Sequence, residues 1–299
     1  MSRINEHLDQ HHLREPLQSA YLTNHSTETA LIKVFNDILC AVDDRQCVML
    51  VLLDLSSAFD TIDHDMMLSR LESLFGIDGD ALAWIKSYFR QRSQKVVING
   101  CSSTPVPLTT GVPQGSVVGP GIFPVYTKPI GTVAREHGIN LHLYADDTQL
   151  YVGCPLKDQE MTKQQLESCV ADVRDWMAAN MLKLNDSKTE YIVIGSKHTL
   201  DQVCEKLKCI QVGGESIAMS ASARNIGVCM DSTLRMEEQV ANICRACYGV
   251  IRDISRIRHY LTEEATKQLM IALVITKLDC NNALLYKISK TILSKLQLV

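Results

Sequence analysis

The sequence predicts an α+β fold, in which helices pack on one face of an antiparallel sheet and a helical lobe follows at the C-terminal end. Two observations support this prediction. Between residues 26 and 230, short apolar runs of strand-like composition alternate with segments whose apolar residues recur at helical spacing. From residue 235 onward only the helical spacing is present, over residues 235–258 and 262–286.

The first part of this pattern is a helix followed by a strand that ends in an aspartate. Residues 26–43 are expected to form the helix, because their apolar side chains share one face and Ser26 or Thr27 can cap it. The unbroken apolar run over residues 47–53 is typical of a central strand buried on both faces. Asp54 follows at the rim of the sheet, where ligands tend to bind, although it could instead cap the next helix.

The next part of the chain contains two helices, a hairpin and a glycine-containing loop. Helices are expected over residues 64–75 and 79–92, and the sequence KVVING at 95–100 is a strong hairpin signal. The loop TTGVPQGS at 109–116 has two glycines, which let a backbone approach a ligand closely. The amide of Gln114 could bond to phosphate or base, but the loop alone also fits an ordinary structural turn.

The tetrapeptide YADD at 144–147 lies between two apolar, strand-like runs at 139–143 and 148–152. This pattern predicts a β-hairpin with two carboxylates, Asp146 and Asp147, at its tip. Adjacent carboxylates repel each other, and a fold that keeps them close usually neutralises them with a cation. Oxygen ligands favour Mg²⁺, and polymerases use two such ions about 3.5–4 Å apart. A bare Asp-Asp pair also fits a simple polar turn.

The segments after the hairpin predict core packing rather than a cofactor site. Residues 158–182 form a long amphipathic pattern, and a strand is expected over residues 191–194. Short strands are expected near residues 209–219 and 225–230. The apolar stripe of the long helix consists of Leu166, Val170, Val173, Trp176, Met177 and Met181.

Size and composition limit the class of protein. The chain has 299 residues, which suits one large domain or one domain with lobes, and its 46% hydrophobic content is enough for a sizeable core. Its 11 cysteines are scattered through mostly apolar segments, as is typical of reduced, buried thiols. Without a membrane-length apolar stretch or a signal peptide, an intracellular location, nucleus or cytoplasm, and no membrane partner are expected.

Charge is distributed unevenly along the chain. The formal net charge is −4, but residues 241–299 contain nine basic and four acidic residues. Arg245, Arg252 and Arg256 recur at helical spacing and share one face. Such a face suits contact with nucleic-acid phosphates, and a plain solvated face is the alternative.

Four segments occur in an order that resembles the palm motifs of a reverse transcriptase. They are LLDLSSAFDTIDH at 52–64, TTGVPQGSVVGP at 109–120, LYADD at 143–147 and LNDSKTEYIVIGS at 184–196. Two further segments, QSAYLTNHSTETAL at 18–31 and ARNIGVCMDSTL at 223–234, are similar to the LINE-type (non-LTR) retrotransposon group.

This resemblance covers the chain from about residue 4 to its end and implies the right-hand polymerase architecture of fingers, palm and thumb. Fingers and palm would occupy residues 1–235, with the palm mainly at 45–63 and 108–235. Residues 236–299 would form a partial helical thumb, whose basic face would ride on the duplex backbone.

The resemblance also implies roles at the catalytic centre. Asp54 and Asp146 would be the principal ligands of two Mg²⁺ ions, and Asp147 would complete the carboxylate set. The backbone carbonyl of Leu55 would help to hold one ion. Lys188 would neutralise or protonate the departing pyrophosphate, a task that suits a compact charge with three donors. A solvated lysine before the next strand is an equal alternative.

Other residues would contact the nucleotide and the nucleic acid. Phe59 would lie under the incoming sugar and exclude a 2′-hydroxyl. Gln114 and Gly115 would border the nucleotide and the template, and residues 225–230 would form the primer grip.

The implied function is RNA-directed DNA polymerisation. The 3′-hydroxyl of a DNA primer on an RNA template would attack the α-phosphate of a deoxynucleoside triphosphate, and pyrophosphate would leave in line. LINE-type proteins usually also carry an endonuclease domain before the polymerase. This chain starts near the fingers, so an endonuclease is expected only in trans, if at all.

Two residues depart from the family pattern. Leu22 stands where the family usually has an arginine that grips the triphosphate. Pro124 falls inside an expected helix, at a cost of about 3 kcal/mol or more. The alternative function is therefore that of a truncated or decayed retroelement copy, which keeps the fold and nucleic-acid binding without catalysis.

Overall fold

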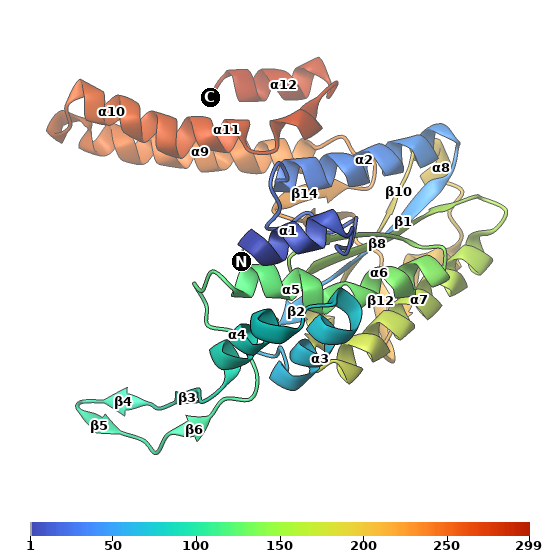
Figure 1. The fold of residues 1–299 in the computed structure, drawn as a ribbon. Helices are drawn as coiled ribbons and strands as arrows, with labels where there is room; N and C mark the ends of the chain where they lie inside the picture. Colours follow the sequence, from blue (N-terminus) through green and yellow to red (C-terminus); the bar gives the residue numbers. More distant parts are fainter. Residues whose placement is uncertain (1) are drawn as a thin grey trace.

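A four-stranded antiparallel sheet lies at the centre of the computed structural model, which describes residues 2–299 (Figure 1). Its strands follow the order β10-β1-β8-β7. They are β1 (Cys47–Leu53), β7 (Asn140–Tyr144), β8 (Asp147–Cys154) and β10 (Glu190–Ile194). Strand β1 is an inner strand, and every one of its residues is buried.

The two faces of β1 enter two separate cores. Met49 and Val51 belong to the larger core, whereas Val48 and Leu50 belong to the second one. The expectation that helices cover only one face is therefore wrong. Because alternate β1 side chains are apolar on both sides, the second face also needs a cover, which helix α2 (Thr27–Asp43) provides.

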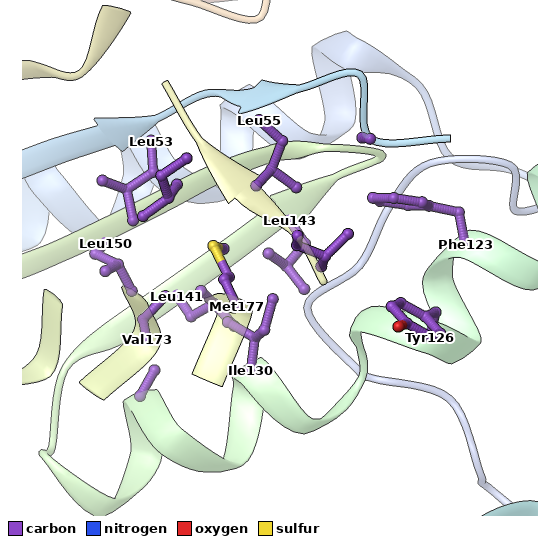
Figure 2. Close-up of a cluster of buried hydrophobic side chains, with 14 of the residues drawn as sticks. Leu53, Leu55, Phe123, Tyr126, Ile130, Leu141, Leu143, Leu150, Val173 and Met177 are labelled. Atoms are coloured by element: carbon purple, nitrogen blue, oxygen red, sulfur yellow. The ribbon is translucent and has the colours of Figure 1, made fainter. Parts of the chain in front are cut away.

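Five helices cover the larger core from the side opposite α2 (Figure 1), and Leu8 near the N-terminus also belongs to this core. The five helices are α3 (His64–Phe75), α4 (Gly79–Phe89), α5 (Gly119–Thr127), α6 (Pro129–Glu136) and α7 (Gln159–Ala179). Figure 2 shows Leu53 and Leu150 of the sheet among Ile130 of α6 and Val173 and Met177 of α7. This packing fixes the strand ends that carry the aspartates.

Smaller elements surround the sheet. Helix α1 (Ser2–Gln10) and the short α8 (Lys197–Leu200) lie outside it. The paired strands are β2 (Leu55–Ser56) with β9 (Lys183–Leu184), β3 (Ser93–Gln94) with β6 (Val106–Pro107), β4 (Val97–Ile98) with β5 (Cys101–Ser102), β11 (Cys209–Val212) with β12 (Glu215–Ala218) and β13 (Ser222–Asn225) with β14 (Val228–Asp231). Strands β3 to β6 form an arm that projects from the body (Figure 1). Two 3₁₀ turns, η1 (Asp186–Lys188) and η2 (Glu205–Lys208), complete this part.

The C-terminal lobe is helical, as expected, and lies beyond α2 (Figure 1). It contains α9 (Glu237–Ile257), η3 (Arg258–Tyr260), α10 (Glu263–Met270), the π-helical η4 (Ile271–Ile275), α11 (Thr276–Asp279), η5 (Asn282–Leu285) and α12 (Lys290–Gln297). The helix expected over residues 262–286 ends at Asp279, because Cys280 is extended and Asn281 has a φ of 55°. Across residues 2–299, no helix is both long enough and apolar enough to cross a membrane.

One predicted helix start is confirmed, and two further predicted helix ends are wrong. Ser26 caps α2 through a capping box with Thr29, as the sequence suggested. Helix α4 ends at Phe89 rather than at residue 92, because Arg90 is extended. Helix α7 ends at Ala179, and Met181, which was placed in its apolar stripe, is exposed with a φ of 57°.

Helix α5 continues through Pro124, which is buried inside it. Proline has no N–H group, so the Pro120 carbonyl loses the hydrogen bond that the helix would otherwise supply. The segment therefore keeps its helical path despite this cost.

The buried ring of His142 lies on β7 at the edge of the sheet and is 3% exposed. Its Nε2 is hydrogen-bonded to Ser19 Oγ at 2.9 Å, whereas Nδ1 has no partner. Burial, helped by the positive charge of Lys33, lowers the pKa of His142 to about 4. The ring is therefore neutral in the folded protein at neutral pH.

Acid is expected to destabilise the protein through His142. Because its pKa falls from 6.5 to about 4 on folding, the unfolded chain takes up this proton first as the pH drops below 6.5. The free energy of unfolding should fall by about 3 kcal/mol between neutral pH and about pH 4, because each pKa unit corresponds to about 1.4 kcal/mol. Urea unfolding at about pH 7.5 and about pH 4.5 measures it.

The variant His142→Gln should lose less stability than the wild type over this pH interval. His198→Gln, which changes an exposed histidine, is the matched control and should follow the wild type. Equal losses in all three proteins would contradict the prediction.

Candidate active site

The tip of the β7–β8 hairpin carries two of the predicted carboxylates. Tyr144 and Asp147 form the last pair of the ladder, so the loop contains only Ala145 and Asp146. Ala145 has a φ of 55°, a left-handed conformation that glycine usually adopts in such turns. The hairpin predicted from the sequence is therefore confirmed, with a strained residue before the two aspartates.

Asp54 lies at the same rim of the sheet. In the antiparallel β1–β8 ladder Leu53 opposes Thr148. Asp54 follows Leu53 and Asp147 precedes Thr148, so both aspartates lie at the same end of this strand pair. The alternative role of Asp54 as a helix cap is wrong, because the extended strand β2 follows it and Asp63 caps the next helix.

Lys188 forms an ion pair at this rim. Its Nζ lies 3.2 Å from Asp54 Oδ2, and its side chain is 65% exposed. The turn that carries it is held on two sides. The Asn185 N–H donates to the Asp54 carbonyl at 2.9 Å, and the Asp186 carboxylate pairs with both terminal nitrogens of Arg174 on α7.

The carboxylates at the rim are only partly compensated. Burial, together with the charges of Asp146 and Asp54, raises the pKa of Asp147 to about 6. Burial and the nearby Asp54 also raise the pKa of Asp146, while Lys188 opposes this effect. Asp54 Oδ2 is shielded from solvent and receives no hydrogen bond of good geometry. Three carboxylates therefore face a single lysine.

This surplus of negative charge fits a divalent cation. Within residues 2–299, no three histidine, cysteine, aspartate or glutamate side chains already converge as a complete metal site. Mg²⁺, however, is commonly bound by only one or two carboxylates together with substrate phosphates. The only partly compensated charge of Asp54 and the raised pKa values of Asp146 and Asp147 are what such a partly built site should show.

Asp54 and Asp147 open onto a cleft of about 510 Å³, whereas Asp146 is not among the residues that line it. Asp54, Asp147 and Lys188 line one side of it. The other side is the turn of the β13–β14 hairpin, with Arg224, Ile226 and Gly227. The predicted primer grip, residues 225–230, thus faces the aspartates.

The β13–β14 hairpin is tied to the sheet beneath the cleft. Asn225 Nδ2 donates to Gln149 Oε1 at 2.7 Å, and both side chains are buried. The N–H of Arg224 donates to the Glu190 carboxylate at 2.8 Å. These contacts fix the distance between the turn and the carboxylates.

The residues predicted to contact the nucleotide lie on neighbouring loops. Leu55 is buried in β2, and half-buried Phe59 packs on Phe123, with 4.8 Å between ring centroids. Gln114 and Gly115 are exposed and do not line the cleft that holds Asp54.

Gly111 of the same loop has a structural role. Its φ is 84°, and a Cβ there would lie 2.9 Å from the Asp60 carbonyl oxygen. The following residue, Val112, donates its N–H to the Phe59 carbonyl at 2.9 Å. The glycines predicted a close approach of this loop to a ligand. At Gly111 the loop instead approaches the backbone of Asp60.

The basic face of the C-terminal lobe is separate from the carboxylates. Arg245, Arg252 and Arg256 are exposed on α9. A second hollow, of about 650 Å³, lies between α9 and the β13–β14 hairpin, and none of these arginines lines it. Its basic residues are Arg224 and Lys277, which the sequence analysis did not single out. No spacing pattern links these two, because they come from different elements.

The two departures from the family pattern are neighbours in space. Leu22 and Pro124 both line a small hollow that also includes Phe75 and Val125. Leu22 is half-buried there and is not among the residues that line the cleft of Asp54.

With this geometry in place, the family can be assigned. The family model for reverse transcriptase (RNA-dependent DNA polymerase) matches residues 1–228, about three quarters of the chain. The chain belongs to the reverse transcriptase family. The match includes all three aspartates, and membership implies dependence on divalent metal ions and on a nucleic-acid template.

Named relatives confirm the LINE-type (non-LTR) group. The probable RNA-directed DNA polymerase from transposon BS of Drosophila melanogaster is 25% identical over 273 residues, 90% of this chain and 29% of that protein. The RNA-directed DNA polymerase from mobile element jockey of Drosophila melanogaster is 23% identical over 234 residues, 77% of this chain and 24% of that protein. The chain therefore spans less than a third of their length. They support a reverse transcriptase domain and do not favour the alternative of a decayed copy.

Solved structures confirm the right-hand polymerase fold. An apo telomerase from Candida tropicalis, truncated from its C-terminal domain, matches with a TM-score of 0.53 at 11% identity, over 77% of this chain and 44% of that one. Candida tropicalis telomerase with a fragment of telomeric RNA matches with a TM-score of 0.51 at 10% identity, over 97% of this chain and 47% of that one. The exact limits of fingers, palm and thumb stay a prediction.

Replacing Asp147 by asparagine is expected to stabilise the metal-free protein at neutral pH by about 1–2 kcal/mol, after allowance for partial exposure. Folding raises the Asp147 pKa from 3.8 to about 6, so the ionised group opposes folding above pH 6. This cost disappears as the pH falls toward 3.8. Urea unfolding without divalent ions, at about pH 7.5 and about pH 4.5, measures the difference.

Asp186→Asn is the matched control with the opposite sign. The Arg174 guanidinium lowers the pKa of Asp186, so removing that charge should destabilise the protein at neutral pH. The prediction fails if Asp147→Asn is no more stable than the wild type at the higher pH, or gains more at the lower one.

Proposed function

We propose that this domain extends a DNA primer with deoxynucleotides on an RNA template. The observation that carries the proposal is the shared cleft, in which Asp54, Asp147 and Lys188 face the turn at Ile226 and Gly227. A cleft with surplus carboxylate charge on one wall, and with Arg224 and a hairpin turn on the other, suits phosphoryl transfer. Positioning and charge stabilisation do most of the catalytic work in that reaction.

Asp54 and Asp146 would be the main ligands of two Mg²⁺ ions, with Asp147 and the Leu55 carbonyl as further oxygen donors. When bound, the ions would lower the pKa of the primer hydroxyl and neutralise the charge that develops on the phosphates. The surplus charge at the rim supports this assignment, because divalent ions would relieve it.

The chain's own residues would position the substrates. Lys188 would move from Asp54 to the pyrophosphate, which its 65% exposed side chain leaves it free to do. Phe59, fixed against Phe123, would limit the space under the sugar. Gln114 and Gly115 would border the nucleotide and template from their exposed loop.

The primer 3′ end would lie on the turn of residues 225–230, opposite the aspartates. The duplex behind it would pass the hollow that contains Arg224 and Lys277, and the Arg245–Arg256 face would give further phosphate contact. An RNA partner is supported by the telomerase relative, whose structure contains a fragment of telomeric RNA.

Primer extension tests the proposal. Wild-type protein with Mg²⁺, deoxynucleotides and a DNA primer on an RNA template should give extended product. Asp146→Ala should lose about 100-fold or more in rate, because it removes a ligand of the ions. Asp201→Ala, at an exposed aspartate far along the chain, should extend like the wild type. Folded wild-type protein without extension at any Mg²⁺ concentration would overturn the proposal.

Leu22→Arg and Pro124→Ser distinguish an inactive protein from a damaged enzyme. Their shared hollow means that the two changes should be tested together as well as singly. Extension that appears only after this repair would assign the chain to a decayed copy.

A further inference from the structure

One buried side chain outside the carboxylate set holds the tip of the catalytic hairpin. Gln18 is 3% exposed and lies in the segment before α2, far from the hairpin in sequence. Its Oε1 accepts hydrogen bonds from the N–H of Ala145 at 3.1 Å and from the N–H of Ala20 at 2.9 Å. Its Nε2 donates to the Ala145 carbonyl at 3.3 Å.

These bonds reach the strained residue of the turn. Ala145 has a φ of 55°, which is unfavourable for a residue with a Cβ. Gln18 satisfies both its N–H and its C=O, so the bonds favour this conformation over a relaxed one. Because Asp146 follows directly, the conformation of Ala145 sets the direction in which the carboxylates leave the turn.

The segment that carries Gln18 is itself fixed. Leu17 accepts from the Leu143 N–H at 2.7 Å, and the Ser19 N–H donates to the Leu143 carbonyl at 3.0 Å, which adds a short parallel bridge to β7. Just before it, the buried Glu15 carboxylate forms a two-point ion pair with Arg135 of α6, at 2.8 and 3.0 Å.

Gly131 of α6 leaves the space that the Glu15 carboxylate occupies in this ion pair. A Cβ at Gly131 would overlap the Glu15 carboxylate. The chain from Glu15 to Ser19 is thus attached to α6 at one end and to β7 at the other, so Gln18 reaches the tip from a rigid base.

We propose that Gln18 is a positioning residue for catalysis, which acts through Ala145 and keeps Asp146 and Asp147 in the geometry that binds the metal ions. This inference rests on the proposed polymerase function. Gln18 itself need not touch the primer, the nucleotide or the ions. We call the hydrogen bonds of Gln18 to Ala145 the clamp. Misplacement of a catalytic group by about 1 Å can lower a rate by about 100-fold, so loss of the clamp should lower kcat measurably.

Gln18→Met tests the inference, because methionine has a similar length but cannot make these bonds. It should lower kcat for primer extension by about 10- to 100-fold and leave the KM for deoxynucleotide within about threefold. Ser19→Ala is the matched control: it removes a buried hydrogen bond to His142 from the same segment without touching the tip. It should keep kcat within about twofold of the wild type.

A second substitution separates positioning from general stability. Glycine tolerates a positive φ, so Ala145→Gly should reduce the need for the clamp. In the Gln18→Met background it should restore about 10-fold or more of the lost kcat. Because glycine at a positive φ can also stabilise the fold, urea unfolding of the single and double variants is measured beside kcat. A kcat that only follows the free energy of unfolding would contradict the positioning role.

Hydrogen exchange at the Ala145 amide gives a readout that needs no activity. This N–H should exchange at least about 10-fold faster in Gln18→Met, and at the wild-type rate in Ser19→Ala. Unchanged exchange, a kcat within twofold of the wild type, or an equal kcat loss in Ser19→Ala would overturn the inference. An inactive wild type whose Ala145 amide still depends on Gln18 would overturn the polymerase function and leave the clamp supported.

Discussion

The antiparallel pairing of β1 with β8 is the interaction on which the site depends. Its register opposes Leu53 to Thr148, and this brings Asp54 and Asp147 to one rim. The register is fixed by burial, because alternate side chains of β1 enter two different cores. A slip of one residue would exchange those side chains between the cores and would move Asp54 away from the hairpin tip.

The rim shows how a proposed catalytic centre can oppose stability. Burial and mutual repulsion raise the pKa values of Asp146 and Asp147, and Lys188 balances only part of the charge. Hydrogen bonds and an ion pair fix the elements around these carboxylates, and we call these contacts the supports. Arg174 holds the turn of Lys188, and Asn225 joins the opposite hairpin to Gln149. Neither of these contacts uses an oxygen of Asp54, Asp146 or Asp147.

The supports come from distant parts of the chain, which explains how a short sequence change far from the aspartates can matter. The segment before α2 supplies Gln18 and is anchored by Glu15 to α6. Leu22 and Pro124, the two departures from the family pattern, lie together beside this segment and line one hollow with Gln18. A change at either position thus acts next to the base of the clamp rather than in the cleft.

The sequence by itself determined the elements with strong local signals. Residues 47–53 are a strand because seven consecutive apolar residues must be buried, and Ser26 begins a helix because its hydroxyl can cap it. The two aspartates after Tyr144 lie at a hairpin tip because apolar strand-forming runs flank them. The order of these motifs was also enough to indicate the family.

Only the tertiary structure decided which groups meet. Three of these contacts join residues far apart in the chain. They are the packing of α2 on the second face of the sheet, the ion pair of Lys188 with Asp54 and the hydrogen bonds of Gln18 with Ala145. Such contacts depend on packing angles and strand register, which leave no periodic trace in a single sequence. Local chemistry therefore fixed what each segment is, while packing fixed the geometry on which any catalysis depends.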